Sequence, residues 1–203
     1  MKKATFLLAI LLLVASFFGI FISEGYATAS FGHTALGTTK GMNGFPGIYV
    51  SAFQAPIEAN NGIITEVVCA VQTISGSGFV VPVVYAADGQ ANQYASLGPS
   101  TLLSTGPPVA IGSTMEWRHM ALSTLVTIQG GKTYYLGFLS NVGTYVSQDY
   151  RNPPSTPKTI FEMELAGGWW TYPNPPAKFG KVTYVHAGVN ILAAYAVYTI
   201  NSP

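Results

Sequence analysis

The residues best suited to hold a ligand lie in one aromatic and proline-rich stretch, residues 142–177. Prolines stiffen this stretch, so its flat rings can be held outward at a low cost in conformational entropy. The apolar face of a sugar ring lies well against Trp or Tyr, and carboxylate, guanidinium and amide groups can bond its hydroxyls. We therefore predict a binding set that consists of Trp169, Trp170, Tyr172, Tyr145, Tyr150, Asp149, Arg151 and Asn174.

The same aromatic residues allow two other interpretations. Trp169 and Trp170 are consecutive, so on an extended segment their side chains point in opposite directions and at least one faces the protein. The stretch could therefore form a contact between subunits or pack as an ordinary loop, because exposed aromatic residues mark interaction surfaces without identifying the partner. We favour stacking of a sugar or another polymer, and both alternatives stay open.

Groups that could catalyse a reaction are few. Glu162 and Glu164 share one face of a predicted strand and could form the carboxylate pair of a glycoside hydrolase, but a solvated outer face explains their spacing better. Cys69 falls on the apolar face of another predicted strand, which favours a small buried residue over a nucleophile. The chain has no Gly-x-Ser-x-Gly motif, and we predict that it is not an enzyme.

Metal ligands are equally sparse. His33, His119 and His186 stand far apart, and no two of them have the spacing of a zinc site. We predict no metal site formed by histidine and no cofactor. A structural calcium ion held by loop carbonyls and Asp88 stays open, although the sequence contains no acidic calcium-binding loop.

An apolar run at residues 4–22 follows Lys2 and Lys3 and precedes Ala27-Thr28-Ala29. This order fits a secretory signal that is cleaved after Ala29. A helix of this length spans about 28 Å, which also suits an uncleaved membrane anchor, and processing after Lys3 would instead keep the run as the spine of a type IV pilin. We favour the cleaved signal and expect an extracellular or cell-surface protein, which would meet the membrane only through residues 1–29 and only if they stay uncleaved.

The remaining residues, 30–203, suffice for one domain with a substantial core. They keep seven of the nine basic and seven of the eight acidic residues, and such a neutral surface excludes electrostatic binding of nucleic acid. Charged residues make up 8% of the chain and hydrophobic residues 49%. With Cys69 as the only cysteine no internal disulfide can form, so packing, a metal or neighbours in an assembly must supply the stability.

Short β-branched and aromatic runs alternate with Gly, Pro, Asn and Ser beyond the leader, which predicts an all-β domain. In residues 63–73, Val67, Cys69 and Val71 share one face. Residues 79–86 form a second predicted strand, and Pro82 indicates that this strand lies at an edge or that its amide position faces a bulge. The other predicted strands are residues 115–122, 125–129, 133–139, 159–165, 182–186 and 189–200.

Trp117 is a further candidate for ligand contact. Met120 and Leu122 share a strand face that can enter the core, whereas Trp117 and His119 take the opposite face. Trp117 is then either a surface anchor or a packing residue under a loop, and we favour packing because single tryptophans are mostly buried.

Several short motifs follow one another in a characteristic order along residues 30–198. They are Phe31-Gly32-His33-Thr34 with Gly37, then Gly62-Ile63-Ile64-Thr65, Val84-Tyr85-Ala86-Ala87-Asp88-Gly89, Trp117-Arg118-His119-Met120-Ala121-Leu122 and Gly130-Gly131-Lys132-Thr133-Tyr134-Tyr135-Leu136-Gly137-Phe138. Their order resembles a family of secreted archaeal and bacterial jelly-roll modules that are similar to carbohydrate-binding and galactose-binding-like domains. The resemblance implies a two-sheet antiparallel jelly-roll-like sandwich with a binding, adhesive or structural role.

Two classes of function follow from these expectations. The first is a non-catalytic binding or adhesion module for a polysaccharide or another component of the cell envelope. The second is a structural subunit of an extracellular filament or coat, which self-assembles when residues 30–47 add as a strand to the sheet edge of a neighbour. Low charge and the absence of an internal disulfide suit the second class, and the resemblance and the proline-braced aromatic residues suit the first.

Overall fold

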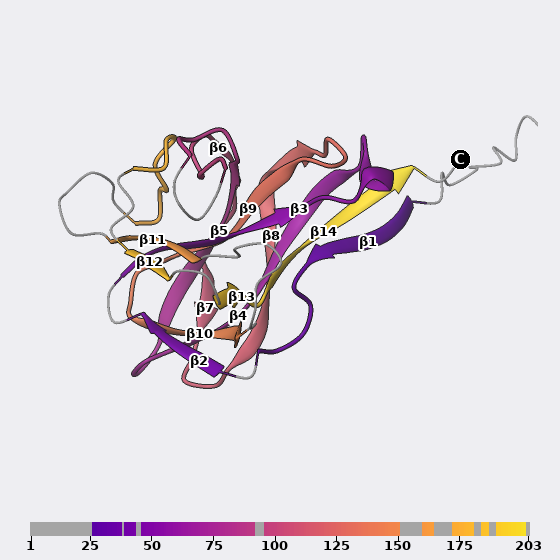
Figure 1. Ribbon diagram of the computed structural model, residues 1–203. Coiled ribbons are helices and arrows are strands. Elements are labelled where there is room, and N and C mark those ends of the chain that lie inside the picture. The colour runs from indigo at the N-terminus through magenta and orange to yellow at the C-terminus, as the bar shows by residue number, and fades with distance from the viewer. Residues whose placement is uncertain are drawn as a thin grey trace, which may run out of the picture.

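The computed structural model describes residues 26–37, 39–43, 46–91, 96–150, 160–164, 172–180, 184–186 and 190–201. Most of the predicted leader, including its apolar run, lies outside these residues. The described chain is all-β and forms two antiparallel sheets that pack face to face (Figure 1). Within it, no helix is long and apolar enough to cross a membrane.

The first sheet, sheet A, has β4 near its centre. One edge of β4 pairs with β8, and the other edge pairs first with β14 and then with β10. The strands of sheet A are β1 (Tyr26–Gly32), β2 (Thr39–Asn43), β4 (Ile63–Thr73), β8 (Glu116–Thr127), β10 (Thr144–Tyr150), β13 (Asn190–Leu192) and β14 (Ala194–Asn201).

The second sheet, sheet B, has β9 between β3 and β5. A single 3₁₀ turn, η1 (Ile57–Ala59), follows β3 in the described chain. The strands of sheet B are β3 (Gly47–Gln54), β5 (Gly78–Ala86), β6 (Leu102–Thr105), β7 (Val109–Ile111), β9 (Thr133–Ser140), β11 (Ile160–Glu164) and β12 (Tyr184–His186).

The central strand β4 confirms the prediction for residues 63–73. Val67, Cys69 and Val71 enter the core between the sheets, as their alternation requires. Val68 and Ala70 on the opposite face are also buried, because the neighbouring strands carry large side chains over them. β4 is therefore buried on both faces, and side chains of the neighbouring strands form the outer surface of sheet A above it.

Of the two alternatives predicted from Pro82, the edge position for β5 is wrong, and a bulge opposite the position of Pro82 agrees with the structure, since residues 106–108 face residues 81 and 82. β5 pairs with β9 along one side, and with β7 and β6 along the other. Pro82 lies between the segment paired with β7, which ends at Val80, and the segment paired with β6, which begins at Val83. A proline is accommodated in an interior strand because neither β6 nor β7 pairs with its position.

Residues 115–122 and 125–129, predicted as two strands, form the single strand β8. The pairing with β4 nevertheless breaks where the two predictions met, since Ile64 pairs with Val126 and Glu66 pairs with Ala121. The residues of β8 between these pairs, 122–125, form a bulge that leaves Leu125 exposed.

The described residues of 30–47, the segment expected to add to a neighbour, pair within their own chain. β1 pairs with β14 from Tyr26 opposite Asn201 to Gly32 opposite Tyr195, and β2 pairs with β10. β1 begins four residues before the boundary predicted at Ala29, so cleavage there would remove more than half of this strand. Addition of residues 30–47 to a neighbour would first require them to leave these partners.

Two buried layers lie on the two faces of sheet B. The layer between the sheets joins β4 to inward residues of sheet B such as Tyr49 and Phe138, whose ring centroids are 5.5 Å apart. The second layer covers the opposite face of sheet B and contains Ile48, Val50, Val81, Val83, Tyr85, Tyr135, Leu139 and Phe179. Strands that are apolar on both faces need a cover on each side, and part of the second cover comes from residues 172–180.

Candidate functional site

The predicted binding set falls only partly within the described structure. Arg151, Trp169 and Trp170 lie outside the described residues. Asp149 and Tyr150 belong to β10, opposite Ile191 and Asn190 of β13, and only their backbone is described. Tyr145, Tyr172 and Asn174 are described with their side chains.

Tyr172 belongs to the cover of sheet B. Its side chain is half-buried and packs against the second apolar layer, whereas Asn174 is exposed. Burial raises the pKa of the Tyr172 hydroxyl. This placement agrees with the interpretation of Tyr172 as a packing residue of the loop.

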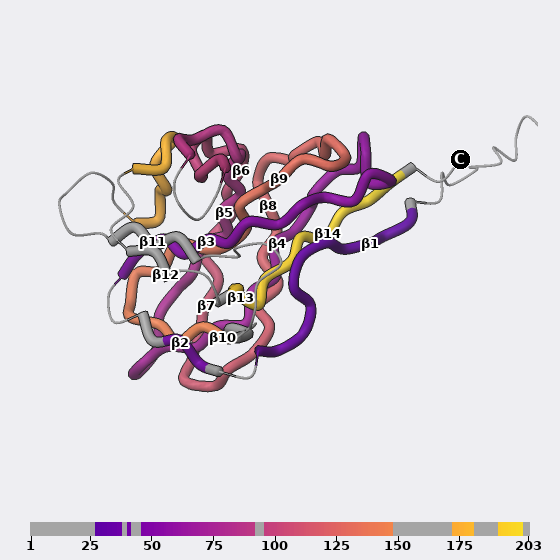
Figure 2. Tube along the Cα trace, viewed as in Figure 1, coloured from indigo at the N-terminus to yellow at the C-terminus, as the bar shows by residue number. Residues whose placement is uncertain are grey.

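Hydrogen bonds fix the cover segment, residues 172–180, to sheet B. The Tyr85 hydroxyl donates to the Pro176 carbonyl at 3.0 Å, and the Phe179 ring meets the Tyr85 ring edge to face at 5.1 Å. The Phe179 amide donates to Ser100 and the Leu102 amide donates to Ala177. Figure 2 shows this segment, coloured near the C-terminal end of the scale, beside the connection that leads into β6.

Tyr145 lies on the other side of the molecule. It stands opposite Gln72 on β4, next to Val146, which points into the core. Because neighbouring strand residues point to opposite faces, Tyr145 projects from the outer face of sheet A. Tyr145 and Tyr172 therefore lie on opposite outer surfaces of the sandwich, and the structure does not bring these two members of the predicted set together.

Two further aromatic residues share the outer face of sheet A with Tyr145. Trp117 of β8 pairs with Ala70, and Tyr195 of β14 pairs with Val68. Their rings lie 5.3 Å apart with an angle of 63° between the planes. The two rings cover Val68 and Ala70 of β4 from the strands on either side, and both rings stay partly exposed.

Polar groups flank these rings on the same face. His119 Nδ1 lies 3.1 Å from Glu66 Oε1, with 60% of the histidine and 25% of the glutamate side chain exposed. On the other side Lys40 Nζ donates to Gln72 Oε1 at 3.2 Å. We call the seven side chains together the aromatic face: Lys40, Glu66, Gln72, Trp117, His119, Tyr145 and Tyr195.

The electrostatics of the aromatic face suit binding better than proton transfer. Burial raises the pKa of Tyr195 above its ordinary value, and the nearby Glu66 carboxylate raises it further. Tyr195 therefore stays protonated near neutral pH and can both donate and accept a hydrogen bond. Cationic, anionic, amide and hydroxyl groups stand beside apolar rings, which is the mixture that a polyhydroxylated ligand needs.

Only part of the aromatic face was anticipated. Tyr145 was named as a binding residue, and Trp117 and His119 were placed on the outward face of their strand. Tyr195 was missed, although its two-residue spacing from Val197 and Thr199 marks it as lying on one face of a predicted strand. Lys40 was missed because the glycine-rich stretch around it does not alternate.

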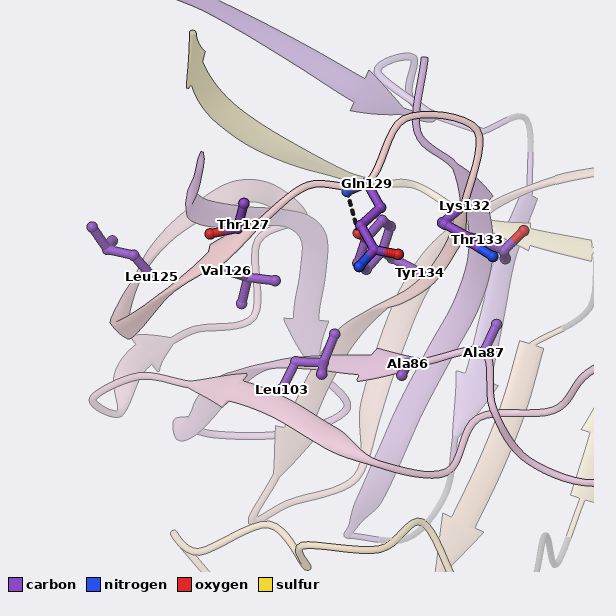
Figure 3. A pocket seen from close by; sticks show the side chains of 10 residues that line it. All are labelled: Ala86, Ala87, Leu103, Leu125, Val126, Thr127, Gln129, Lys132, Thr133 and Tyr134. Carbon is purple, nitrogen blue, oxygen red and sulfur yellow. Dashed lines mark hydrogen bonds between the residues drawn. The ribbon is translucent and has the colours of Figure 1, made fainter. Parts of the chain in front are cut away.

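A cleft of about 410 Å³ with a mixed polar and apolar lining forms a second candidate site. Its walls come from the ends of β5, β6, β8 and β9, and Lys132 is its one charged lining residue among those described (Figure 3). Its aromatic residue, Tyr134, is only 6% exposed, and the Tyr134 hydroxyl accepts the Gln129 amide at 2.8 Å. This cleft offers no free ring for a sugar to stack on.

Asp88, just after β5, is hydrogen-bonded to Thr101, just before β6. Both carboxylate oxygens accept hydrogen bonds from Thr101, one from its hydroxyl and one from its amide. These bonds hold the pKa of Asp88 below its ordinary value. Among the residues that the structure describes, no three or more His, Cys, Asp or Glu side chains gather as a metal site would require.

Comparison of the chain with family models, with curated proteins and with solved structures finds no match. The geometry of the aromatic face is therefore the basis for assigning a function.

Proposed function

We propose that the protein is a non-catalytic binding or adhesion module that holds a carbohydrate polymer against the aromatic face of sheet A. The observation that carries this proposal is the grouping of Trp117, Tyr145 and Tyr195 on one outward sheet face with hydrogen-bonding groups on both sides. A partly exposed ring offers apolar area to the C–H face of a sugar at little entropic cost, because packing already restricts its rotamer.

The wider setting belongs to the same proposal. The sandwich is a jelly-roll-like member of the exported modules that its motifs resemble. The apolar run at residues 4–22 directs it out of the cell, and its partner is a polysaccharide or another envelope component met outside the cell or on its surface. The balanced charge of residues 30–203 supports a neutral ligand over a highly charged one.

Retention on insoluble polysaccharide tests the proposal. The exported protein is passed over cellulose, over chitin and over the isolated envelope of the producing cells. We expect retention on at least one of these, and a loss of at least tenfold in affinity, about 1.4 kcal/mol, for the variant Trp117→Ala/Tyr195→Ala.

Two control variants locate the effect. Phe79→Ala removes a ring that is 46% exposed on β5, away from the aromatic face, and should bind like the unaltered protein. Trp169→Ala/Trp170→Ala tests the proline-rich loop. Loss of retention in this loop variant, with full retention of Trp117→Ala/Tyr195→Ala, would move the site to the loop and contradict the proposal, as would an unaltered protein that none of the three matrices retains. Thermal unfolding of each variant separates lost binding from lost folding.

A further inference from the structure

β1 ends sheet A on one side. Its seven residues pair with β14 in unbroken antiparallel register, from Tyr26 opposite Asn201 to Gly32 opposite Tyr195. Among the described residues no strand pairs with the other side of β1. Alternate amides and carbonyls of β1 therefore point away from the sheet without a strand partner, which makes this edge a template for another strand.

This edge carries none of the features that protect sheet edges. Its sequence, Tyr-Ala-Thr-Ala-Ser-Phe-Gly, contains no charged residue and no proline. β8, the edge strand beside β4 in the same sheet, also lacks a proline, but it contains Glu116, Arg118 and His119, and a bulge interrupts its pairing. Charges and bulges block pairing with other chains, so the chain protects one edge of sheet A and leaves the other open.

β1 is held firmly enough to present this edge. Phe31 is 5% exposed, and its ring lies 6.1 Å from that of Tyr134 and 5.9 Å from that of Tyr198. Residues 27, 28 and 30 are exposed. β1 lies at the margin of sheet A, on the side of β14 that faces away from β4 (Figure 1), so among the described residues its outer edge is free to meet a second strand.

We infer that the open edge of β1 pairs antiparallel with β1 of a second copy of this chain. The pairing places a two-fold axis between the two strands and joins both sheets A into one sheet. Such an isologous contact is self-complementary and closes as a dimer. A second copy suits the edge because two uncharged strands meet without repulsion and contribute main-chain hydrogen bonds on equal terms. This inference goes beyond carbohydrate binding and does not depend on it. It takes the alternative in which residues 26–29 stay on the protein, because β1 begins at Tyr26, in place of the cleavage after Ala29 that the sequence alone favours.

The test is the oligomeric state of the exported protein, measured by sedimentation equilibrium over a range of concentrations. The unaltered protein should form a dimer. Thr28→Lys/Ser30→Lys places two charges on each exposed edge strand and should weaken the dimer at least tenfold, because like charges face one another across the pair. Ser123→Lys/Thr127→Lys adds the same charge to exposed positions of β8 and should leave the dimer intact.

Charge reversal provides a second, independent readout. Thr28→Glu/Ser30→Glu alone should also be monomeric, whereas an equal mixture of the Lys and Glu variants should recover the dimer. Recovery requires that β1 meets β1, which a general loss of folding cannot imitate. Thermal unfolding of each variant alone should stay close to that of the unaltered protein.

Four results would overturn the inference. They are an unaltered protein that is monomeric at every concentration, a Lys variant that dimerises as tightly as the unaltered protein, open-ended fibres in place of a closed dimer, and an amino terminus at Ser30. The last would show that the exported chain lacks residues 26–29 and with them most of the pairing edge.

Discussion

Gly137 stands in the middle of β9, where the backbone of β3 comes close. A Cβ atom added at this position would lie 1.8 Å from the Tyr49 carbonyl oxygen, which is itself part of the β3 backbone. Relief would require the two strands to separate, and neither can move without disturbing the two apolar layers on sheet B. The absence of a Cβ atom at Gly137 thus allows β3 and β9 to lie this close together.

Gly137→Ala should therefore destabilise the protein by about 3 kcal/mol, the upper end of the range for overpacking in a core. Urea unfolding followed by tyrosine and tryptophan fluorescence measures this change. Gly112→Ala is the matched control, since a Cβ there meets nothing within 4 Å. Equal unfolding midpoints for the two variants would contradict the packing described for β9.

The face of a strand on which a residue lies could be predicted from the sequence wherever one face of that strand is clearly apolar. Val67, Cys69 and Val71 were placed correctly for this reason. For Pro82 the two alternatives could not be separated, because a proline indicates a missing hydrogen bond at one position. It does not indicate whether a whole strand or only a gap between two short strands leaves that position unpaired, and here it is the gap between β6 and β7.

At the level of elements, the cover segment is held mainly through Phe179. The ring is 8% exposed and packs against the second layer of sheet B. Phe179→Ala should cost about 3 kcal/mol through the cavity it leaves. It should also speed hydrogen exchange at the Phe179 and Leu102 amides, which donate to Ser100 and Ala177.

Hydrogen exchange at the β4 amides should change less, because these lie under the first layer and open only with the whole domain. Ile57→Ala is the control for loss of apolar area, since Ile57 is 79% exposed and its truncation should alter neither set of amides. Equal acceleration at β4 and at the cover segment would show that the segment does not open as a separate unit.

Elements with strict alternation and clear turns were predictable. β4, β5 and β9 match their predicted bounds within one residue, and the turn before β9 contains Gly131 at a φ of 77°. β3 was missed because it is apolar on both faces and shows no alternation. β1 was missed because its partner, β14, lies at the far end of the chain, so its pairing is decided by tertiary structure and not by local pattern.

Across the whole molecule, buried tyrosine hydroxyls link stability to alkaline pH. Burial raises the pKa of Tyr85 and of Tyr135 well above the ordinary value of 10.0. Below pH 10 both the folded and the unfolded chain keep these groups protonated, and their contribution is complete. Above pH 10 only the unfolded chain ionises, so stability falls as pH rises, at up to about 1.4 kcal/mol per pH unit for each group.

Urea unfolding midpoints at pH 9, 10 and 11 measure this slope. Tyr85→Phe and Tyr135→Phe should each make the decline between pH 10 and 11 shallower, in addition to a constant loss at every pH from the hydrogen bonds to Pro176 and Leu97. Slopes that are the same in the variants and the unaltered protein would show that other groups govern the alkaline transition.

The site was the least predictable feature because it is a property of the assembled sheet. Lys40, Trp117, Tyr145 and Tyr195 come from four strands, and β4 brings them together by lying between β8 on one side and β10 and β14 on the other. Aromatic residues that are near in sequence, Tyr145 and Tyr172, were separated by the thickness of the sandwich. Proximity along the chain was therefore a poor guide to proximity in space.

Ala27-Thr28-Ala29, the predicted cleavage motif, lies inside β1. If the chain is exported and cleaved there, the peptidase needs these residues as an extended segment that is not yet paired. That condition would hold only until β14, some 170 residues further along the chain, has been synthesised and pairs with β1. The first residue of the mature protein would then show whether cleavage or strand pairing came first.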